Sequence, residues 1–279
     1  MAILSIQSHV AYGYVGNKAA VFPLQSMGYD VWPVNTVQFS NHTGYGIWQG
    51  EVFSSEHIRD VIAGIEAIGI ADECEAILSG YMGSSEICHE VQRTVENFKG
   101  KNSNVLYLCD PIIGNTSCFV KPEVLEFFKT HLHADIITPN QFEAETLSGI
   151  SIKTIADLKS VANYFHDAEI GIVVITGVKL NDLAEGYYVF ISYDSVCQAI
   201  KVNEYSFLIS PNGTGDLFSA VFLGSYLANK NPSEALQRTV YLTDQVMQNT
   251  FAAKSRELKI IGVNYAGTAS GELPQIIDL

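Results

Sequence analysis

The sequence contains few basic residues. Sixteen lysines and arginines stand against 30 aspartates and glutamates, which gives a formal net charge of −14. Nucleic acids and anionic membranes are bound by clustered Lys and Arg, so this charge argues against both as partners. A phosphate ligand would have to be neutralised locally, by helix N-termini and a divalent cation more than by lysines.

Paired cysteines and long hydrophobic runs are also absent. The five cysteines, Cys74, Cys88, Cys109, Cys118 and Cys197, are odd in number and form no C-x-x-C pair, which argues against a disulfide framework and a zinc site. The first residues carry no basic segment ahead of their short apolar run, and no run approaches the length of a membrane span. We therefore expect a cytoplasmic protein with reduced thiols and no signal peptide.

Two common nucleotide-binding motifs are missing. The chain has no G-x-x-x-x-G-K-[ST] segment, which excludes the P-loop class. A dinucleotide-binding oxidoreductase would need a glycine fingerprint directly after the first strand. Gly13-x-x-Gly16 does not fit that fingerprint, and Gly44-x-Gly46 with Gly50 has the wrong final spacing. An NAD(P)-linked oxidoreductase is thus suggested only by the order of strands and helices described next.

Short β-rich runs alternate with amphipathic stretches along the 279 residues, and no linker, repeat or low-complexity segment divides them. Continuous apolar strands separated by helices predict an α/β fold with a parallel sheet covered on both faces. We expect one domain over residues 1–279. The predicted strands are Ile3–Gln7, Asp30–Thr36, Glu75–Leu78, Asn104–Cys109, Asp135–Thr138 and Gly171–Thr176, with a hairpin or meander over Tyr187–Ile191 and Val196–Val202. The predicted helices are Gly16–Met27, Ser55–Ile68, Ser85–Phe98, Pro122–His131, Gln141–Leu147, Ile155–His166, Gly213–Asn229 and Pro232–Ala253.

Polar and glycine residues follow several of the predicted strands. In open parallel sheets, ligands bind at the carboxyl ends of the strands. The loops that begin at Ser8, Ser79, Asp110 and Thr138 are therefore the expected place for a binding site.

The segment Gly213-Thr214-Gly215-Asp216 precedes the apolar stretch Leu217–Leu223. Free N–H groups and the dipole of a helix start can hold an anion, and Asp216 would place a carboxylate beside it. An anion cradle with an adjacent base is the minimum equipment for moving a phosphoryl group onto a hydroxyl. Simple helix capping is the alternative interpretation, although two glycines favour close approach of the backbone to a ligand.

Asp110 and Glu143 also have two interpretations. Asp110 precedes a proline at a strand end, and Glu143 opens a helix, so one can be a turn residue and the other a partner of the helix dipole. As functional groups, their oxygens would hold Mg²⁺ near a triphosphate, through water. The residues alone do not decide between these interpretations.

Residues 35–50 are rich in aromatic and turn-forming residues. They predict either a hairpin whose aromatic side chains pack on the sheet, or a small flap over a flat aromatic substrate. In the second case His42 and Thr43 would be the polar contacts.

Taken together, these motifs resemble the pyridoxal kinase family of the ribokinase-like superfamily. The resemblance runs in order from Ile3 to about Leu227 and is carried by Ser5–Val10, Gly13–Asn17, Val37–Tyr45, Cys109–Pro111, Asp135–Glu145 and Gly213–Phe218. The closing G-x-G-D is common to the superfamily, whereas the segments Ser5–Asn17 and Val37–Tyr45 are typical of vitamin B6 kinases.

The resemblance implies a ribokinase-like, mainly parallel sheet flanked by helices, a homodimer, and ATP-dependent phosphorylation of the 5′-hydroxymethyl group of pyridoxal, and often of pyridoxine and pyridoxamine. It implies Mg²⁺ and commonly K⁺ as cofactors. By position, Asp216 would be the catalytic base and Gly213, Thr214 and Gly215 the anion hole. The pyridine pocket would comprise Ser8, Val15, Phe39, His42, Thr43 and Tyr81. ATP and its cations would be bound by Asp110, Thr138, Asn140, Glu143 and Thr176, with the metal at Asp110 and Glu143.

Three segments depart from the family pattern. The loop Asn115–Lys121 is short, and residues 177–209 and the tail from Arg256 match weakly, so adenine contacts beyond Thr176 are not assigned. Cys118 lies in the short loop. If that loop folds over the pocket, the Cys118 thiolate could add to the aldehyde of pyridoxal as a hemithioacetal. The alternative functions are a hydroxymethylpyrimidine or other small-molecule kinase of the superfamily and a non-catalytic B6-binding protein.

Overall fold

A computed structural model describes residues 2–267 and 271–279 of the chain. Ten strands in these residues form one sheet in the order β10-β9-β8-β7-β6-β5-β4-β1-β2-β3. The six strands from β2 to β7 along this order are parallel, and β3, β8, β9 and β10 pair antiparallel. The strands are β1 (Ala2–Val10), β2 (Asp30–Phe39), β3 (Gly50–Val52), β4 (Cys74–Ser79), β5 (Leu106–Cys109), β6 (Ile136–Ile137), β7 (Ile172–Val178), β8 (Tyr188–Tyr193), β9 (Val196–Lys201) and β10 (Ile276–Asp278).

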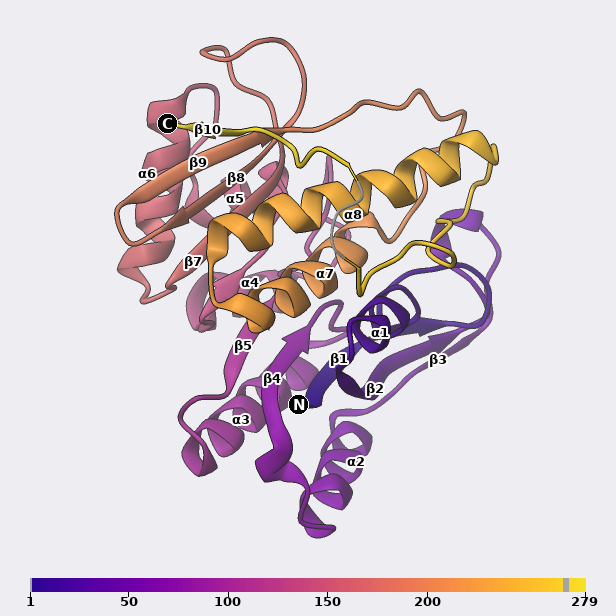
Figure 1. The fold of residues 1–279 in the computed structure, drawn as a ribbon. Helices are drawn as coiled ribbons and strands as arrows, with labels where there is room; N and C mark the ends of the chain where they lie inside the picture. Colours follow the sequence, from indigo (N-terminus) through magenta and orange to yellow (C-terminus); the bar gives the residue numbers. More distant parts are fainter. Residues whose placement is uncertain (1, 268–270) are drawn as a thin grey trace.

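Helices cover both faces of the sheet. Figure 1 shows α1, α7 and α8 together on the face toward the viewer, and α2 to α6 belong to the other side. The helices are α1 (Asn17–Ser26), α2 (Ser55–Ala67), α3 (Ser85–Lys101), α4 (Pro122–His131), α5 (Gln141–Ser148), α6 (Ile155–Asp167), α7 (Thr214–Asn229) and α8 (Pro232–Ala252), with 3₁₀ turns η1 (Thr43–Tyr45) and η2 (Ala71–Glu73). The predicted α/β architecture is thus confirmed.

Alternation along the strands explains the two layers. In β1, Leu4 and Ile6 join the core cluster beneath α2–α6, whereas Ile3 joins the cluster beneath α1, α7 and α8. Successive side chains of a strand point to opposite faces, so a strand buried on both sides is mostly apolar, although β1 also buries Ser5 and Gln7. For this reason most of the central strands appear in the sequence as short hydrophobic runs and not as alternating polar and apolar residues.

The element boundaries differ from the predictions in a few places. The first strand continues to Val10, and α3 continues to Lys101. The predicted strand Asp135–Thr138 is reduced to Ile136–Ile137. Next to it, the Asp135 carboxylate accepts hydrogen bonds from Lys99 Nζ at 2.7 Å and from the Tyr107 N–H at 2.6 Å. The strands β3 and β10 were not predicted, since three residues are too few to show a period.

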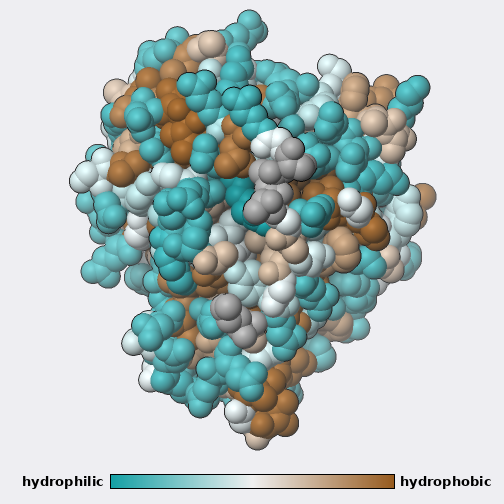
Figure 2. All heavy atoms as spheres, in the orientation of Figure 1, coloured by the Kyte–Doolittle hydropathy of each residue, from teal (hydrophilic) through white to brown (hydrophobic). Residues whose placement is uncertain are grey.

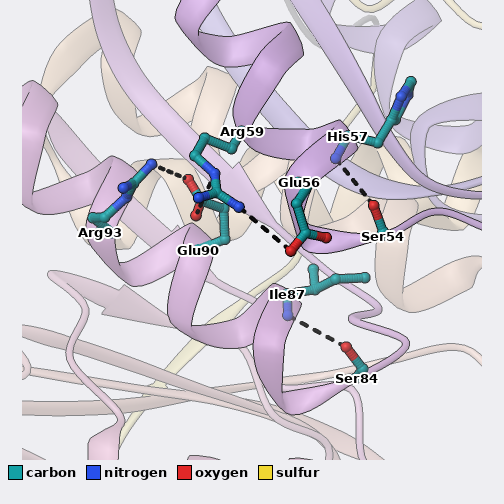
Figure 3. A network of polar contacts seen from close by, with 8 residues as sticks. All are labelled: Ser54, Glu56, His57, Arg59, Ser84, Ile87, Glu90 and Arg93. Carbon is teal, nitrogen blue, oxygen red and sulfur yellow. Dashed lines mark hydrogen bonds and ion pairs between the residues drawn. The ribbon is translucent and has the colours of Figure 1, made fainter.

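A polar network joins α2 to α3 (Figure 3). Glu90 of α3 is 8% exposed and pairs with Arg93 at 2.8 Å and with Arg59 of α2 at 3.8 Å. Arg59 also lies 3.7 Å from Glu56, and Ser54 and Ser84 cap the two helices. The Arg59–Glu90 contact crosses from α2 to α3, and none of these residues lines the cavity described below.

Polar residues cover most of the face seen in Figure 2, and hydrophobic residues reach it in separate patches. Among residues 2–267 and 271–279, no helix is both long and apolar enough to span a membrane.

Candidate active site

A cavity of about 770 Å³ opens at the carboxyl ends of the parallel strands. The structure brings together there every residue predicted to bind substrate, nucleotide or an anion. These residues are Ser8, Val15, Phe39, His42, Thr43, Tyr81, Asp110, Thr138, Asn140, Glu143, Thr176, Gly213, Thr214, Gly215 and Asp216. They come from many different strands, helices and loops along the chain, so only the folded sheet places them side by side.

The helix α7 begins at Thr214, with Gly213 as its N-cap residue in the left-handed region at φ 87°. A Cβ atom on Gly213 would overlap the carbonyl oxygen of Tyr14, so this glycine is required by the backbone of the first loop. Gly215 differs, because the nearest atom to a Cβ there would be Asp110 Oδ2 at 3.8 Å. The Gly215 backbone therefore faces the acidic side of the cavity.

Asp216 lies in the first turn of α7 and is 8% exposed. Its Oδ1 atom has no hydrogen-bond partner among the described residues. Burial raises the pKa of Asp216 to about 6, although the N–H groups of Gly16 and of Asp216 itself oppose that rise. At neutral pH the side chain is thus a carboxylate that can accept a proton.

Asp110 is linked to α7 by a short chain of hydroxyl groups. Ser219 Oγ donates to Asp110 Oδ2 at 3.0 Å, and Thr138 Oγ1 lies 2.8 Å from Ser219 Oγ. Burial and the nearby Glu143 and Asp216 raise the pKa of Asp110 well above its usual range. Sequence analysis missed Ser219, although its place three residues after Asp216 puts both on one side of the helix.

Glu143 belongs to the capping box of α5. Its Oε2 accepts the N–H of Asn140 at 2.9 Å, and Asn140 Oδ1 accepts the N–H of Glu143 at 3.0 Å. Its Oε1 accepts the N–H groups of Ile113 at 2.9 Å and Gly114 at 3.3 Å. Burial raises the pKa of Glu143 to about 7. The structural role proposed for Glu143 at the helix start is therefore present, and the same side chain also lines the cavity.

Three buried carboxylates thus face one space, and no lysine or arginine is among the described residues that line it. Burial is the main cause of their raised pKa values, and the neighbouring carboxylates add to it for Asp110 and Glu143. A divalent cation fits this donor set, because carboxylate oxygens are the ligands that Mg²⁺ prefers. The described residues contain no group of three or more His, Cys, Asp and Glu side chains placed to hold a metal. Phosphate oxygens and water would therefore have to complete the coordination.

Residues 40–49, the flap, connect β2 to β3 and contain η1. The flap is shorter than the predicted segment, because β2 continues to Phe39, whose ring lies 4.4 Å from that of Trp48. His42 Nδ1 accepts the N–H of Gly44 at 3.1 Å, which leaves Nε2 to carry the proton in the neutral ring. Burial lowers the pKa of His42, so the neutral ring is the form expected at neutral pH. The flap ends in a β2–β3 pairing, as the hairpin interpretation predicted, and it also borders the cavity.

The opposite end of the cavity is formed by residues that sequence analysis left unassigned. Apolar side chains from β8, α8 and the segment after β9 line it, namely Val189, Val202 and Val240. Met247 of α8 also lines the cavity, with its Sδ 3.8 Å from Thr214 Oγ1. Beside the valines, Asp244 accepts hydrogen bonds from Asn203 Nδ2 at 3.0 Å and from Tyr205 OH at 2.8 Å. No motif marks these residues, because they come from distant parts of the chain.

Cys118 is exposed and is not among the residues that line the cavity. Its Sγ lies 3.8 Å from the Val120 carbonyl oxygen, whereas the neighbouring Phe119 does line the cavity. The 115–121 loop therefore borders the site in this structure, but with Phe119 toward it.

Comparisons with known proteins identify the family of the chain. The family described as phosphomethylpyrimidine kinase matches residues 51–260. The chain is 41% identical over 269 residues to "Pyridoxal kinase PdxY" of Corynebacterium diphtheriae, covering 94% of this chain and 93% of that protein. It is 39% identical over 267 residues to "Pyridoxal kinase PdxY" of Aliivibrio fischeri, covering 93% and 92%.

Solved structures of pyridoxal kinases are also similar to this chain. Pyridoxal kinase from Leishmania donovani, in complex with ADP and pyridoxine, superposes with a TM-score of 0.91 at 29% identity, covering 100% of this chain and 99% of that one. Plasmodium falciparum PdxK, with AMP-PNP and PL, superposes with a TM-score of 0.87 at 26% identity, covering 100% and 98%. On the match to the curated relatives over more than nine-tenths of its length, the chain belongs to the pyridoxal kinase family.

Proposed function

We propose that this protein transfers the γ-phosphoryl group of ATP to the 5′-hydroxymethyl group of pyridoxal, giving pyridoxal 5′-phosphate in vitamin B6 salvage. We propose that pyridoxine and pyridoxamine are substrates as well. The observation that carries it is the placement of Asp216. A buried carboxylate, one of whose oxygens has no hydrogen-bond partner among the described residues, lies in the first turn of a glycine-capped helix and lines the cavity that the flap borders. The Leishmania donovani structures contain ADP with pyridoxine or pyridoxamine, which supports the assignment.

In the proposed reaction, Asp216 accepts the proton of the substrate hydroxyl as its oxygen bonds to the γ-phosphorus. The bond from that phosphorus to the oxygen bridging the β-phosphate breaks, and ADP leaves. The backbone N–H groups of residues 213–215 and the positive end of the α7 dipole stabilise the charge on the transferring group. A bound Mg²⁺ would neutralise phosphate charge. Asp110 would hold it, with Glu143 acting through water because backbone N–H groups already occupy both Glu143 oxygens.

The flap end of the cavity suits a pyridine ring. Val15, Phe39 and Tyr81 supply apolar and aromatic surface, and the neutral His42 ring presents a donor at Nε2. Ser8 and Thr43 are the hydroxyl groups proposed to bond the ring substituents. A flat aromatic alcohol fits this set better than a sugar, whose many hydroxyl groups would need more polar partners.

The end lined by valines is the proposed place for adenine. The Thr243 Oγ1 atom is buried there without a hydrogen-bond partner among the described residues. A buried hydroxyl without a partner is costly, and a nitrogen of the base would satisfy it. In the proposal, the phosphates of ATP lie between the adenine and Asp216. The residues that would bind them there are Thr138, Asn140 and Thr176.

A coupled assay of ADP formation tests the function, with ATP and Mg²⁺ held constant and one acceptor at a time. We expect turnover with pyridoxal, pyridoxine and pyridoxamine, and appearance of pyridoxal 5′-phosphate in its absorption band. If hydroxymethylpyrimidine were the only acceptor phosphorylated, the protein would instead be a hydroxymethylpyrimidine kinase. Vitamin binding without any ADP formation would indicate a non-catalytic B6-binding protein.

The proposal also includes the predicted domain organisation, location, oligomeric state and monovalent cation. One sheet that runs from Ala2 to Asp278 supports a single domain over residues 1–279. Free cysteines support a cytoplasmic location, since none of the five forms a disulfide. The homodimer and the use of K⁺ follow from the family resemblance. Light scattering on the purified protein tests the first, and exchange of KCl for a tetramethylammonium salt in the assay tests the second.

A further inference from the structure

The segment that follows α8 reaches the flap. It is anchored beside the catalytic helix, because Leu258 and Ile260 are buried in one cluster with Leu217 and Val221 of α7. Two residues just before this anchor, Arg256 and Glu257, extend to the loops that border the substrate end of the cavity. Neither residue lines the cavity.

Glu257 bonds both of these loops at once. Its Oε2 accepts the N–H of Tyr14 at 3.1 Å, in the loop that carries Val15. Its Oε1 accepts the hydroxyl of Tyr45 at 2.7 Å, in the flap that carries His42 and Thr43. A single carboxylate therefore connects the two sides of the predicted pyridine pocket.

Arg256 fixes the same flap residue from another direction. Its guanidinium carbon lies 3.5 Å from the centroid of the Tyr45 ring, within the range of a cation–π contact. Its side chain also donates to the carbonyl oxygen of Gly44 at 2.7 Å. The Tyr45 side chain is thus held at its hydroxyl and at its ring face.

The first loop has a shape that fits Glu257. Gly13 adopts φ 93°, and a Cβ atom there would overlap Glu257 Oε2. The bases of the two loops are joined by backbone bonds, from Ala11 N–H to Phe39 O at 2.9 Å and from Tyr12 N–H to Ser40 O at 2.8 Å. Farther toward the flap tip, the contact passes through the Tyr14–Glu257–Tyr45 bonds.

We propose that Glu257, supported by Arg256, is a positioning residue that holds the flap over the pyridine pocket and so sets the affinity for the vitamin without taking part in phosphoryl transfer. This inference rests on the proposed function. A carboxylate acceptor outside the cavity acts on the site through the two loops that it bonds, the flap and the loop of Tyr14, and both carry residues of the predicted pyridine pocket. Its loss should therefore affect vitamin binding far more than ATP binding or turnover.

Steady-state kinetics of Glu257→Ala test this. Losing hydrogen bonds to a charged group corresponds to roughly 10- to 100-fold in an equilibrium constant. We expect the KM for pyridoxal to rise by about that factor, with kcat and the KM for ATP changing by less than about threefold. Tyr45→Phe, which keeps the ring under Arg256, should show a smaller rise and add little in the Glu257→Ala background. Glu272→Ala, an exposed glutamate of the same tail, is the control.

Hydrogen–deuterium exchange of residues 40–49 in the free protein provides a readout independent of activity. We expect faster exchange in Glu257→Ala and unchanged exchange in Glu272→Ala. The inference is overturned if exchange and the pyridoxal KM both stay at wild-type values, or if both KM values rise together with a fall in Tm. If Glu257→Ala does not fold, Tyr45→Phe alone decides by the same two measurements. A wild-type protein that phosphorylates no B6 vitamer would refute the proposed function, while the exchange result would still decide whether Glu257 holds the flap.

Discussion

Replacing Asp216 by Asn is the most informative single change, because it removes the proposed base while keeping the shape of the side chain. Proton acceptance by a positioned group contributes roughly 10²–10⁴-fold to a rate. We therefore expect kcat to fall by at least about 100-fold, with little change in the KM for pyridoxal. The exposed Asp60 of α2 gives a matched control as Asp60→Asn, for which both constants should stay unchanged.

The pKa of Asp216 predicts the pH dependence. A pKa of about 6 means that most molecules carry the charged base at pH 7. Turnover should therefore fall about tenfold for each pH unit below that pKa and reach a plateau above it. In Asp216→Asn this acidic limb should disappear from the residual rate. A wild-type profile that is flat between pH 5 and 8 would contradict the assignment.

The same pKa predicts a gain in stability for Asp216→Asn. The folded-state pKa lies above the usual value of 3.8, so folding disfavours the charged form. This penalty is absent below about pH 4, grows as the pH rises, and is complete above the folded-state pKa. A rise of about two units corresponds to about 3 kcal/mol at pH 7, as an upper value. The variant should thus unfold at an equal or higher Tm than the wild type. Loss of activity accompanied by a lower Tm, or more than a tenth of wild-type kcat, would refute the reasoning.

Three further changes test other parts of the structure. Glu90→Ala leaves two arginines without their shared partner and should lower stability by about 1–2 kcal/mol, measured by calorimetry, with kinetics unchanged; altered KM values would contradict the separation of this network from the site. Gly213→Ala should reduce kcat by about 100-fold or more, because a Cβ atom at positive φ overlaps Tyr14 and displaces the anion-binding N–H groups; wild-type turnover would show that those groups are not needed. If the Cys118 thiol adds to the aldehyde carbon of pyridoxal and its proton passes to the aldehyde oxygen, Cys118→Ser should weaken pyridoxal binding. The complex of this variant should then show the absorption of the free aldehyde. An unchanged spectrum and affinity would exclude the adduct.

Much of the architecture was predictable because its signals are local. The strand buried on both faces between Ala2 and Val10 is apolar over most of its length, and the amphipathic helix over 85–101 repeats its buried positions at helical spacing. The glycine pair before Asp216 marks a helix start by the same local chemistry. The residues that follow the parallel strands lie at one edge of the sheet for topological reasons, so their gathering around the cavity could be anticipated.

Other parts of the site carry no local signal. Asn203, Tyr205 and Asp244 meet at the opposite end of the cavity although Asn203 and Asp244 are 41 residues apart. Glu257 bonds Tyr45 across 212 residues, and its segment departs from the family pattern. A carboxylate next to an arginine in a loop is ordinary in sequence, so only the packing of that loop against α7 gives it a role.

The sequence by itself determined the order of most strands and helices, the chemistry of the helix start at Asp216 and the family, because each depends on spacing between near neighbours. Tertiary structure alone decided which carboxylates share one buried space and which tail residue holds the flap. Burial and distance set both the pKa values and the contacts, and neither exists until the chain has folded.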